Sequence, residues 1–252
     1  MLEIRLNELY DVVDKFVIVE ANETFLRERK EYLFATNKNR YKKFLDKIIY
    51  IPIEYPKELA SGWAVENYQR NQIMRGLTNC SGSDIIIISD LDEIPRKELF
   101  SAEKIPSLIQ QLNGNFLQIN QSVRYYFLNF EDSYEWYGST VVSYAGLKQY
   151  SPQTFRNLRE HPQIGIKVKN GGWHLSYIAD IENIQFKIRT FAHEFGKNDY
   201  TNIEKLTRCV NEGLLYFDET RKFKLIPIEE CDLPDYVKQN LEKFRKYIKD
   251  KP

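Results

Sequence analysis

Residues 85–95 read IIIISDLDEIP, and this stretch decides the fold. Four consecutive isoleucines favour a strand that is buried on both faces, as in a parallel sheet. Three carboxylates follow within four residues, and Pro95 limits any continuation of the strand. Because ligands of open α/β sheets bind beyond the carboxyl ends of the strands, we expect a functional site at this edge.

The acidic residues of this stretch are Asp90, Asp92 and Glu93. If the extended backbone persists for one step, Asp90 and Asp92 project from the same side and can share one cation. Carboxylate oxygens suit Mg²⁺ or Mn²⁺ that also carries phosphate oxygens. The alternative is an acidic turn that caps the next helix, because acids favour helix N-termini.

Strand-like and helix-like segments alternate around this stretch, which is typical of an α/β sheet with crossover connections. We therefore predict one α/β domain with a mixed, mostly parallel central sheet flanked by helices. Helices are expected at residues 1–15, 63–79, 103–113, 180–195, 202–215 and 229–250. Strands are expected at residues 16–20, 47–53 and 85–89, with β-rich segments at 115–130, 139–147 and 163–177, and a loop with short helical pieces at 22–46.

Composition excludes several classes of protein. The 252 residues carry 36 basic and 36 acidic side chains, so the chain lacks the positive footprint of a duplex nucleic-acid binder. Hydrophobic residues make up 42% of the chain, which is enough for a substantial core. Three cysteines without close pairing argue against a disulfide framework and against a cysteine metal knuckle.

No membrane or export signal stands out in the sequence. The longest aliphatic run is residues 85–88, far short of the ~20 residues that span a bilayer. The first 15 residues are charged and amphipathic and lack a signal-peptide pattern. We expect no membrane span and a cytoplasmic location.

The predicted helix at residues 63–79 places two charged side chains on its apolar face. Glu66 and Arg70 share an arc of roughly 100° with Trp63, Ile73 and Leu77. In one interpretation the two charges form an i,i+4 pair that covers the rim of the core. In the other, Arg70 points inward and meets an anion.

Residues 171–177, GGWHLSY, form the second candidate motif. Alternation along a strand sets Trp173, Leu175 and Tyr177 on one face and His174 on the other. His174 is either a structural residue or the completion of the metal site. His193 lies off the apolar stripe of its predicted helix, and we expect it to be solvated.

Aromatic and acidic residues mix between residues 125 and 137. Flat rings can meet the apolar faces of sugars while carboxylates bind hydroxyls, although aromatic residues are also common in strands. The members of this group are Tyr125, Tyr126, Phe127, Asn129, Glu131, Asp132, Tyr134, Trp136 and Tyr137.

Two enzyme classes place Asp-x-Asp at the end of such a strand. Phosphatases of the haloacid-dehalogenase group use the first Asp as a nucleophile, but they carry the motif on their first strand. Here about 80 residues precede it, and Ile94 stands where Thr or Val is expected. Nucleotide-sugar glycosyltransferases of the GT-A type have β/α units before the motif and an acceptor half after it, and this order matches.

Several blocks resemble glycosyltransferase family 17, which includes N-acetylglucosaminyltransferases. The likeness extends from about Leu2 to about Asp218. The blocks are LEIRLNELYDVVDKFVIVEAN, ENYQRNQIMRGL, IIISDLDEIP, and GGWHLSYI followed by KIRTFAHEF. SDLDEIP together with GGWH is a fairly specific combination.

The resemblance implies a single GT-A-like domain. It also implies an inverting transfer of a sugar, expected to be N-acetylglucosamine, from a UDP-sugar to a glycan acceptor, with Mn²⁺ or Mg²⁺ as cofactor. Residues 1–95 would form the nucleotide-binding half and 96–218 the acceptor half, followed by a C-terminal helix at 229–250. Two alternatives stay open: a phosphatase that uses Asp90, and a non-catalytic nucleotide-sugar-binding remnant.

The resemblance also assigns roles to residues. Asp90, Asp92 and His174 would bind the metal ion. A wider set would contact the nucleotide sugar: Glu20, Glu66, Gln69, Arg70, Asp90 and Trp173. A carboxylate must deprotonate the acceptor hydroxyl, and the unranked candidates are Glu93, Glu131, Asp132 and Glu194.

Overall fold

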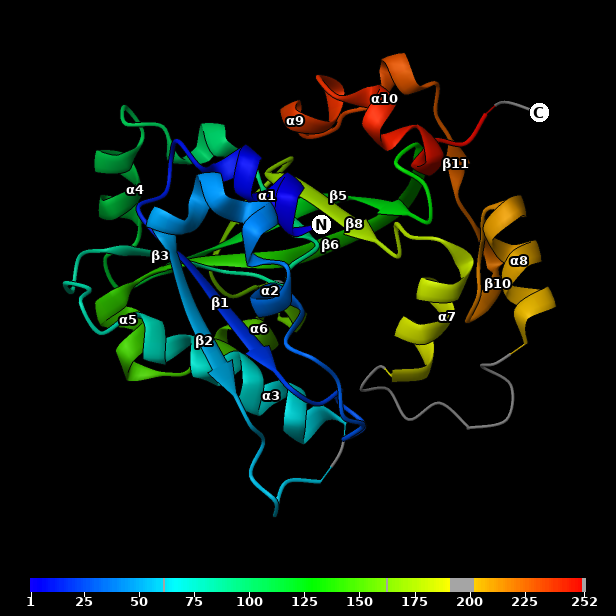
Figure 1. Cartoon of the computed structure of the whole chain (residues 1–252). Coiled ribbons are helices and arrows are strands. Elements are labelled where there is room, and N and C mark those ends of the chain that lie inside the picture. The colour runs from blue at the N-terminus through cyan, green and yellow to red at the C-terminus, as the bar shows by residue number, and fades with distance from the viewer. Residues whose placement is uncertain (61, 162, 191–201, 251–252) are drawn as a thin grey trace.

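A long antiparallel hairpin forms the centre of the fold. Its strands are β5 (Phe116–Tyr125) and β6 (Phe130–Ser143). The computed structural model describes residues 1–60, 62–161, 163–190 and 202–250. Within these residues the chain is a mixed α/β structure in which helices flank a curled sheet (Figure 1).

The remaining strands of this sheet add to the hairpin in both directions. They are β3 (Ile85–Ile88), β4 (Glu93–Pro95), β7 (Ile166–Val168), β8 (Gly172–Ser176) and β11 (Lys224–Leu225). The order β11-β6-β5-β8-β4 forms the main path, while β3 also pairs with β6 and β7 with β5.

The sheet is mixed, so the prediction of a mostly parallel sheet was wrong. Strand β5 pairs in parallel with β7 and β8, but β3, β5 and β11 all run antiparallel to β6, and β4 runs antiparallel to β8. The reason is local: four residues join β5 to β6, which is too short for a parallel crossover. Four isoleucines in β3 are compatible with either direction, because the strand is covered on both faces.

A second, two-stranded parallel sheet holds the first part of the chain. Its strands are β1 (Phe16–Ala21) and β2 (Ile48–Ile53), as predicted. The segment between them contains the short helices α2 (Leu33–Thr36) and η1 (Lys38–Lys47), in agreement with the expected loop with helical pieces. Helix α1 (Leu2–Leu9) packs Leu6 and Leu9 against Phe16 of β1.

Helices cover both faces of the large sheet. On one face Leu108 of α4 (Ile105–Gln111) packs with Ile119 of β5. On the other, Phe155 packs with Ile86 and Ile88 of β3. The helices on this second face are α5 (Tyr144–Gln149), α6 (Pro152–Asn157) and η4 (Leu158–Glu160). Residues 144–147 are helical rather than part of a β-rich segment, because the Ser143 hydroxyl caps α5 by accepting from the Gly146 N–H.

Three other predicted helices are confirmed with different ends. Helix α3 (Trp63–Asn71) continues only as the 3₁₀ turn η2 (Gln72–Gly76). Helix α7 (Ile181–Thr190) is described to Thr190, and the rest of its predicted range lies outside the described residues. Helix α8 (Ile203–Glu212) ends at Gly213, whose φ of 71° gives a left-handed cap. The chain then forms a small hairpin of β9 (Leu214–Leu215) and β10 (Asp218–Lys222).

The single helix predicted at residues 229–250 was wrong. The segment consists of short pieces: η5 (Ile228–Glu230), α9 (Asp235–Lys238), α10 (Leu241–Phe244) and η6 (Arg245–Tyr247). Pro234 precedes α9, and Asn240 has a non-helical backbone before α10. Leu233, Val237 and Phe244 pack with Ile4 of α1 and Leu175 of β8, so this segment braces the sheet as a folded cap (Figure 1).

No helix in the described parts of the chain is long and apolar enough to cross a membrane.

Candidate active site

The acidic stretch forms the turn between β3 and β4, and we call residues 89–93 the acidic turn. Arg5 of α1 holds the backbone of the acidic turn in place. The guanidinium donates to the hydroxyl of Ser89 at 2.6 Å and to the carbonyls of Glu93 at 2.7 Å and Asp90 at 3.2 Å. The first helix therefore determines where the acidic turn lies.

Glu93 is the buried centre of the site. Its residue is 0% exposed, and Nη1 of Arg156 donates to both carboxylate oxygens at 2.8 Å. The indole N–H of Trp136 and the backbone N–H of Asp90 also donate to this carboxylate, each at 2.9 Å. With both oxygens occupied by donors, Glu93 joins the turn to the α6 region and to β6.

Asp90 lies between two guanidinium groups. Its carboxylate accepts from Arg156 at 2.7 Å and from Arg70 at 3.0 Å. Although burial opposes ionisation, Arg156 and Arg70 hold the pKa of Asp90 below its ordinary value. Arg70 also pairs with Glu66 at 2.7 Å, so both interpretations of this helix hold: the i,i+4 pair forms, and Arg70 meets an anion.

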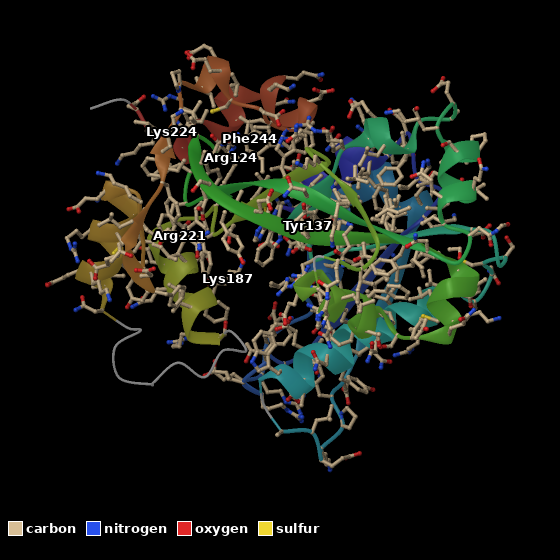
Figure 2. All side chains as sticks on the ribbon, turned by 180° about the vertical axis from the view of Figure 1, so that it is seen from behind. Arg124, Tyr137, Lys187, Arg221, Lys224 and Phe244 are labelled. Carbon is tan, nitrogen blue, oxygen red and sulfur yellow. The ribbon has the colours of Figure 1, made fainter. Side chains whose placement is uncertain are left out.

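Asp92 faces a different pair of groups. Nζ of Lys187, on α7, lies 2.9 Å from its carboxylate, and Nε2 of His174, on β8, lies 3.8 Å away. Burial opposes ionisation of Asp92, but Lys187 and His174 hold its pKa well below the ordinary value. Figure 2 labels Lys187 on α7, on the side of the sheet where Arg221 of β10 also lies.

His174 stacks on the ring of Trp136, with the ring centroids 4.6 Å apart. Burial lowers the pKa of His174, and the opposing attraction of Asp92 does not restore it. The lowered pKa favours the neutral imidazole, and its buried Nδ1 has no hydrogen-bond partner among the described residues. A neutral imidazole is the form that binds metal ions.

The donor set beside Asp92 fits part of a divalent metal site. Asp92 and His174 offer a carboxylate oxygen and an imidazole nitrogen that face each other, and water and phosphate oxygens commonly complete such a shell. Asp90 is occupied by its two arginines. Across the described residues, no three His, Cys, Asp or Glu side chains gather closely enough to form a metal site by themselves.

A broad cleft opens in front of the acidic turn, with walls from α3, β1, β6 and α7. Glu20 lies in this lining at the end of β1 and accepts from the hydroxyl of Tyr50 at 2.9 Å and the N–H of Phe34 at 3.0 Å. Gln69 also lines the cleft and is hydrogen-bonded to the hydroxyl of Tyr55. The structure thus brings Glu20, Gln69 and the acidic turn to one cavity.

Trp173 lies elsewhere. Its side chain is 2% exposed and packs in the core with Ile4 and Leu175, while Arg96 covers its ring at 4.3 Å. Neighbouring strand residues point to opposite faces, so His174 faces the cleft and Trp173 faces the core beneath the C-terminal cap. The predicted alternation is confirmed for Trp173, His174 and Leu175. Tyr177 does not share the face of Trp173, because it follows β8 with a φ of 54° and packs with Tyr126 and Ile184 in another cluster. The alternation separates Trp173 from the other nucleotide-sugar candidates.

The candidates for the catalytic base are dispersed. Glu93 is enclosed, as described above. Glu131 pairs with buried Arg124 at 2.7 Å, whereas Asp132 pairs with Arg221 and lines the cleft. Glu194 and His193 lie outside the described residues.

Several cations of the site were not predicted from the sequence, among them Arg5, Arg156, Arg159, Lys187 and Arg221. Arg5 had a detectable signal, because it lies three residues after Leu2 and four before Leu9, on the apolar stripe of the first helix. Arg156 lies five residues after Ser151, the N-cap of α6, and no local pattern distinguishes it from a surface arginine. Its role depends on residues 63 and 66 positions away in the sequence.

Comparisons with known proteins agree on one family. The sequence model of glycosyltransferase family 17 matches residues 1–249. The chain is 25% identical to the human β-1,4-mannosyl-glycoprotein 4-β-N-acetylglucosaminyltransferase over 299 residues, covering 100% of this chain and 53% of the human protein. The rat enzyme of the same name is also 25% identical, with 52% of its length covered. The chain thus spans about half the length of these relatives.

Proposed function

Because this chain belongs to glycosyltransferase family 17, we propose that it transfers a sugar from a UDP-sugar to a glycan acceptor. N-acetylglucosamine is the proposed sugar, since the named relatives are N-acetylglucosaminyltransferases. The proposal includes a GT-A-like arrangement, in which the donor lies at the acidic turn and the acceptor lies beyond it. The observation that carries it is the acidic turn, held by arginines at the floor of an aromatic-lined cleft.

The donor is proposed to lie between β1 and the acidic turn. Glu20 and Gln69 are polar groups in this part of the cleft and would bind the nucleoside. Glu66 and Arg70 would face the sugar or the phosphates, with Asp90 keeping Arg70 in place. Departure of UDP leaves negative charge on the diphosphate, and fixed cations at this place would stabilise it.

A divalent ion is part of the proposal. Asp92 and His174 would hold Mn²⁺ or Mg²⁺, and Asp90 would contribute through the charge of the turn rather than as a free ligand. When bound, such an ion supplies Lewis-acid stabilisation of the leaving diphosphate. Lys187 forms an ion pair with Asp92 in this structure. When the metal ion binds, Lys187 would have to share the Asp92 carboxylate with the ion or move away from it.

Asp132 is the base candidate that the geometry supports best. It is 7% exposed, lines the cleft, and is held by Arg221. Tyr134 lines the same cleft, is 56% exposed, and offers a flat surface to a sugar ring. In this role Asp132 would accept the proton of the acceptor hydroxyl as that oxygen attacks the anomeric carbon and UDP departs from the opposite face.

The test is ligand-induced thermal stabilisation with UDP, UDP-N-acetylglucosamine and other nucleotide sugars, each with and without Mn²⁺. We expect stabilisation by a UDP-sugar that requires Mn²⁺, and its loss in Asp92→Asn together with a fall in transfer rate of about 100-fold or more. Asp250→Asn is the matched control, because its carboxylate is 77% exposed.

Two outcomes would contradict the proposal. Full transfer activity in Asp92→Asn would remove the metal assignment. Release of inorganic phosphate from a simple aryl phosphate, abolished by Asp90→Asn, would support a phosphatase instead.

A further inference from the structure

The cations around the acidic turn are mostly neutralised by carboxylates. Arg70 pairs with Glu66 and Asp90, and Arg156 pairs with Asp90 and Glu93. Lys187 pairs with Asp92. These cations therefore have little charge to offer a ligand unless their present pairs loosen.

Arg159 is different. It lies on η4, three residues after Arg156, and its guanidinium carbon lies 4.7 Å from the centre of the Trp136 ring. Among the described residues, no carboxylate forms an ion pair with it, and its Nη1 is buried without an acceptor. The residue lines the same cleft as Asp92 and His174.

The surroundings of Arg159 disfavour its charge. Burial lowers its pKa, and the neighbouring Arg156 lowers it further, while Glu93 and Asp90 compensate only in part. A buried N–H donor without an acceptor is costly, and a second guanidinium nearby adds repulsion. A bound anion would satisfy the donor and offset the repulsion.

We propose that Arg159 is a phosphate-binding residue of the cleft, which contacts the diphosphate of the donor from the α6 side. This inference rests on the proposed function for the identity of the ligand. The planar guanidinium lies over the ring of Trp136, and its forked N–H groups match two oxygens of a phosphate. Arg156 would then position the acidic turn, and Arg159 would add an unpaired cation to the side of the phosphates away from Arg70.

The test compares the binding of UDP, uridine and inorganic pyrophosphate to wild type, Arg159→Gln and Arg159→Lys by isothermal titration calorimetry, with Mn²⁺ present throughout. In Arg159→Gln we expect UDP and pyrophosphate to bind about tenfold more weakly or worse, the effect of one charge-assisted hydrogen bond. We expect the affinity for uridine to stay unchanged. Arg159→Lys should retain part of the affinity for UDP and pyrophosphate, because lysine keeps the positive charge but lacks the planar, forked arrangement of N–H donors.

Arg189→Gln is the matched control, since Arg189 also lies over an aromatic ring, that of Phe186, and is exposed. We expect this control to bind all three ligands like wild type. Unliganded Arg159→Gln should be no less stable to heat than wild type, because it loses an unpaired cation. A purely structural role would lower its melting temperature instead.

The outcomes separate this inference from the proposed function. If wild type binds UDP and Arg159→Gln binds it equally well, the inference is overturned and the proposed function stands. If wild type binds pyrophosphate through Arg159 but does not bind UDP, the phosphate site stands and the nucleotide donor is overturned. If wild type binds neither anion, both are overturned.

Discussion

Glu93 and Arg156 form a buried ion pair in which each partner depends on the other. Glu93 is 0% exposed, and Arg156 supplies two of the hydrogen bonds to its carboxylate. Such a pair adds little net stability compared with a well-packed apolar pair, but the loss of one partner leaves a buried charge without compensation. The pair is best understood as a device that fixes the shape of the acidic turn.

Arg156→Met should therefore destabilise the protein strongly. We expect a loss of about 3–5 kcal/mol in the free energy of unfolding, because Glu93 remains buried without its main donor. Urea denaturation followed by circular dichroism measures the change. Arg208→Met, which removes exposed ion pairs on α8, should have no measurable effect; equal losses in the two variants would contradict this account of Arg156.

Gly138 allows Glu93 to occupy its position. A Cβ at residue 138 would come within 2.5 Å of the Glu93 carboxylate and would also collide with Gln121. We expect Gly138→Ala to cost about 1–3 kcal/mol through overpacking and to weaken UDP binding by displacing Glu93. Gly82→Ala is the control, because its Cβ would meet only Ala145 at an ordinary 3.6 Å, and equal stabilities in urea would refute the prediction.

At this scale the sequence predicted the acids of the site better than its cations. Asp90, Asp92 and Glu93 adjoin a run of isoleucines, so their place at the end of a strand could be inferred locally. Arg156 and Lys187 reach the same place from distant helices. Their roles depend on tertiary contacts, which no local pattern encodes.

Among the elements, α1 and α9 meet at a buried carboxylate. Glu8 of α1 is 3% exposed, and burial raises its pKa, although Lys97 partly compensates. The folded protein therefore binds this proton more tightly than the unfolded chain does. By linkage, the free energy of unfolding falls as the pH rises from the ordinary pKa of 4.5 through the raised value.

Glu8→Gln should remove this pH dependence. Near and below pH 4.5 the difference in unfolding free energy between variant and wild type should stay constant. Above pH 4.5 the unfolding free energy of the variant should rise relative to that of wild type as the pH rises, until Glu8 is fully ionised in folded wild type. Urea denaturation at several pH values between 4 and 8 measures the difference, with exposed Glu182→Gln as control. If the variant instead lost stability relative to wild type as the pH rises, the raised pKa of Glu8 would be contradicted.

The elements themselves were predictable where the local pattern was strong. The strands β1, β2 and β3 and the helix α4 appear close to their predicted places. The direction of strand pairing was not predictable in the same way, because the isoleucines of β3 fit any strand covered on both faces. The single C-terminal helix predicted from the amphipathic pattern does not form. The chain departs from helical geometry at Pro234 and Asn240, where the local backbone preference outweighs that pattern.

For the whole molecule, the C-terminal cap holds the first helix against the sheet. Leu233 and Val237 are both 0% exposed and belong to the cluster that contains Ile4 of α1 and Trp173 of β8. Outside this core, Lys97 pairs with Asp235 at 2.7 Å. The cap is therefore part of the main fold rather than an appendage.

Leu233→Ala should destabilise the whole protein by about 2–5 kcal/mol, as expected for a fully buried leucine that leaves a cavity. Ile109→Ala on α4 is the control. Because Ile109 is 42% exposed, this variant should lose far less unfolding free energy. The two urea midpoints provide the comparison. Unfolding of the cap alone, with the rest of the sheet intact, would contradict its integration into the core.

The tie between Arg5 and the acidic turn has a consequence for the order in which the fold can form. Arg5 donates to carbonyls 85 and 88 residues further along the chain, and its helix packs on the much later α9 segment. Contacts between segments so far apart in the sequence require long loops to close, which slows folding. The acidic turn would therefore take its final shape late in folding, after these distant segments have come together.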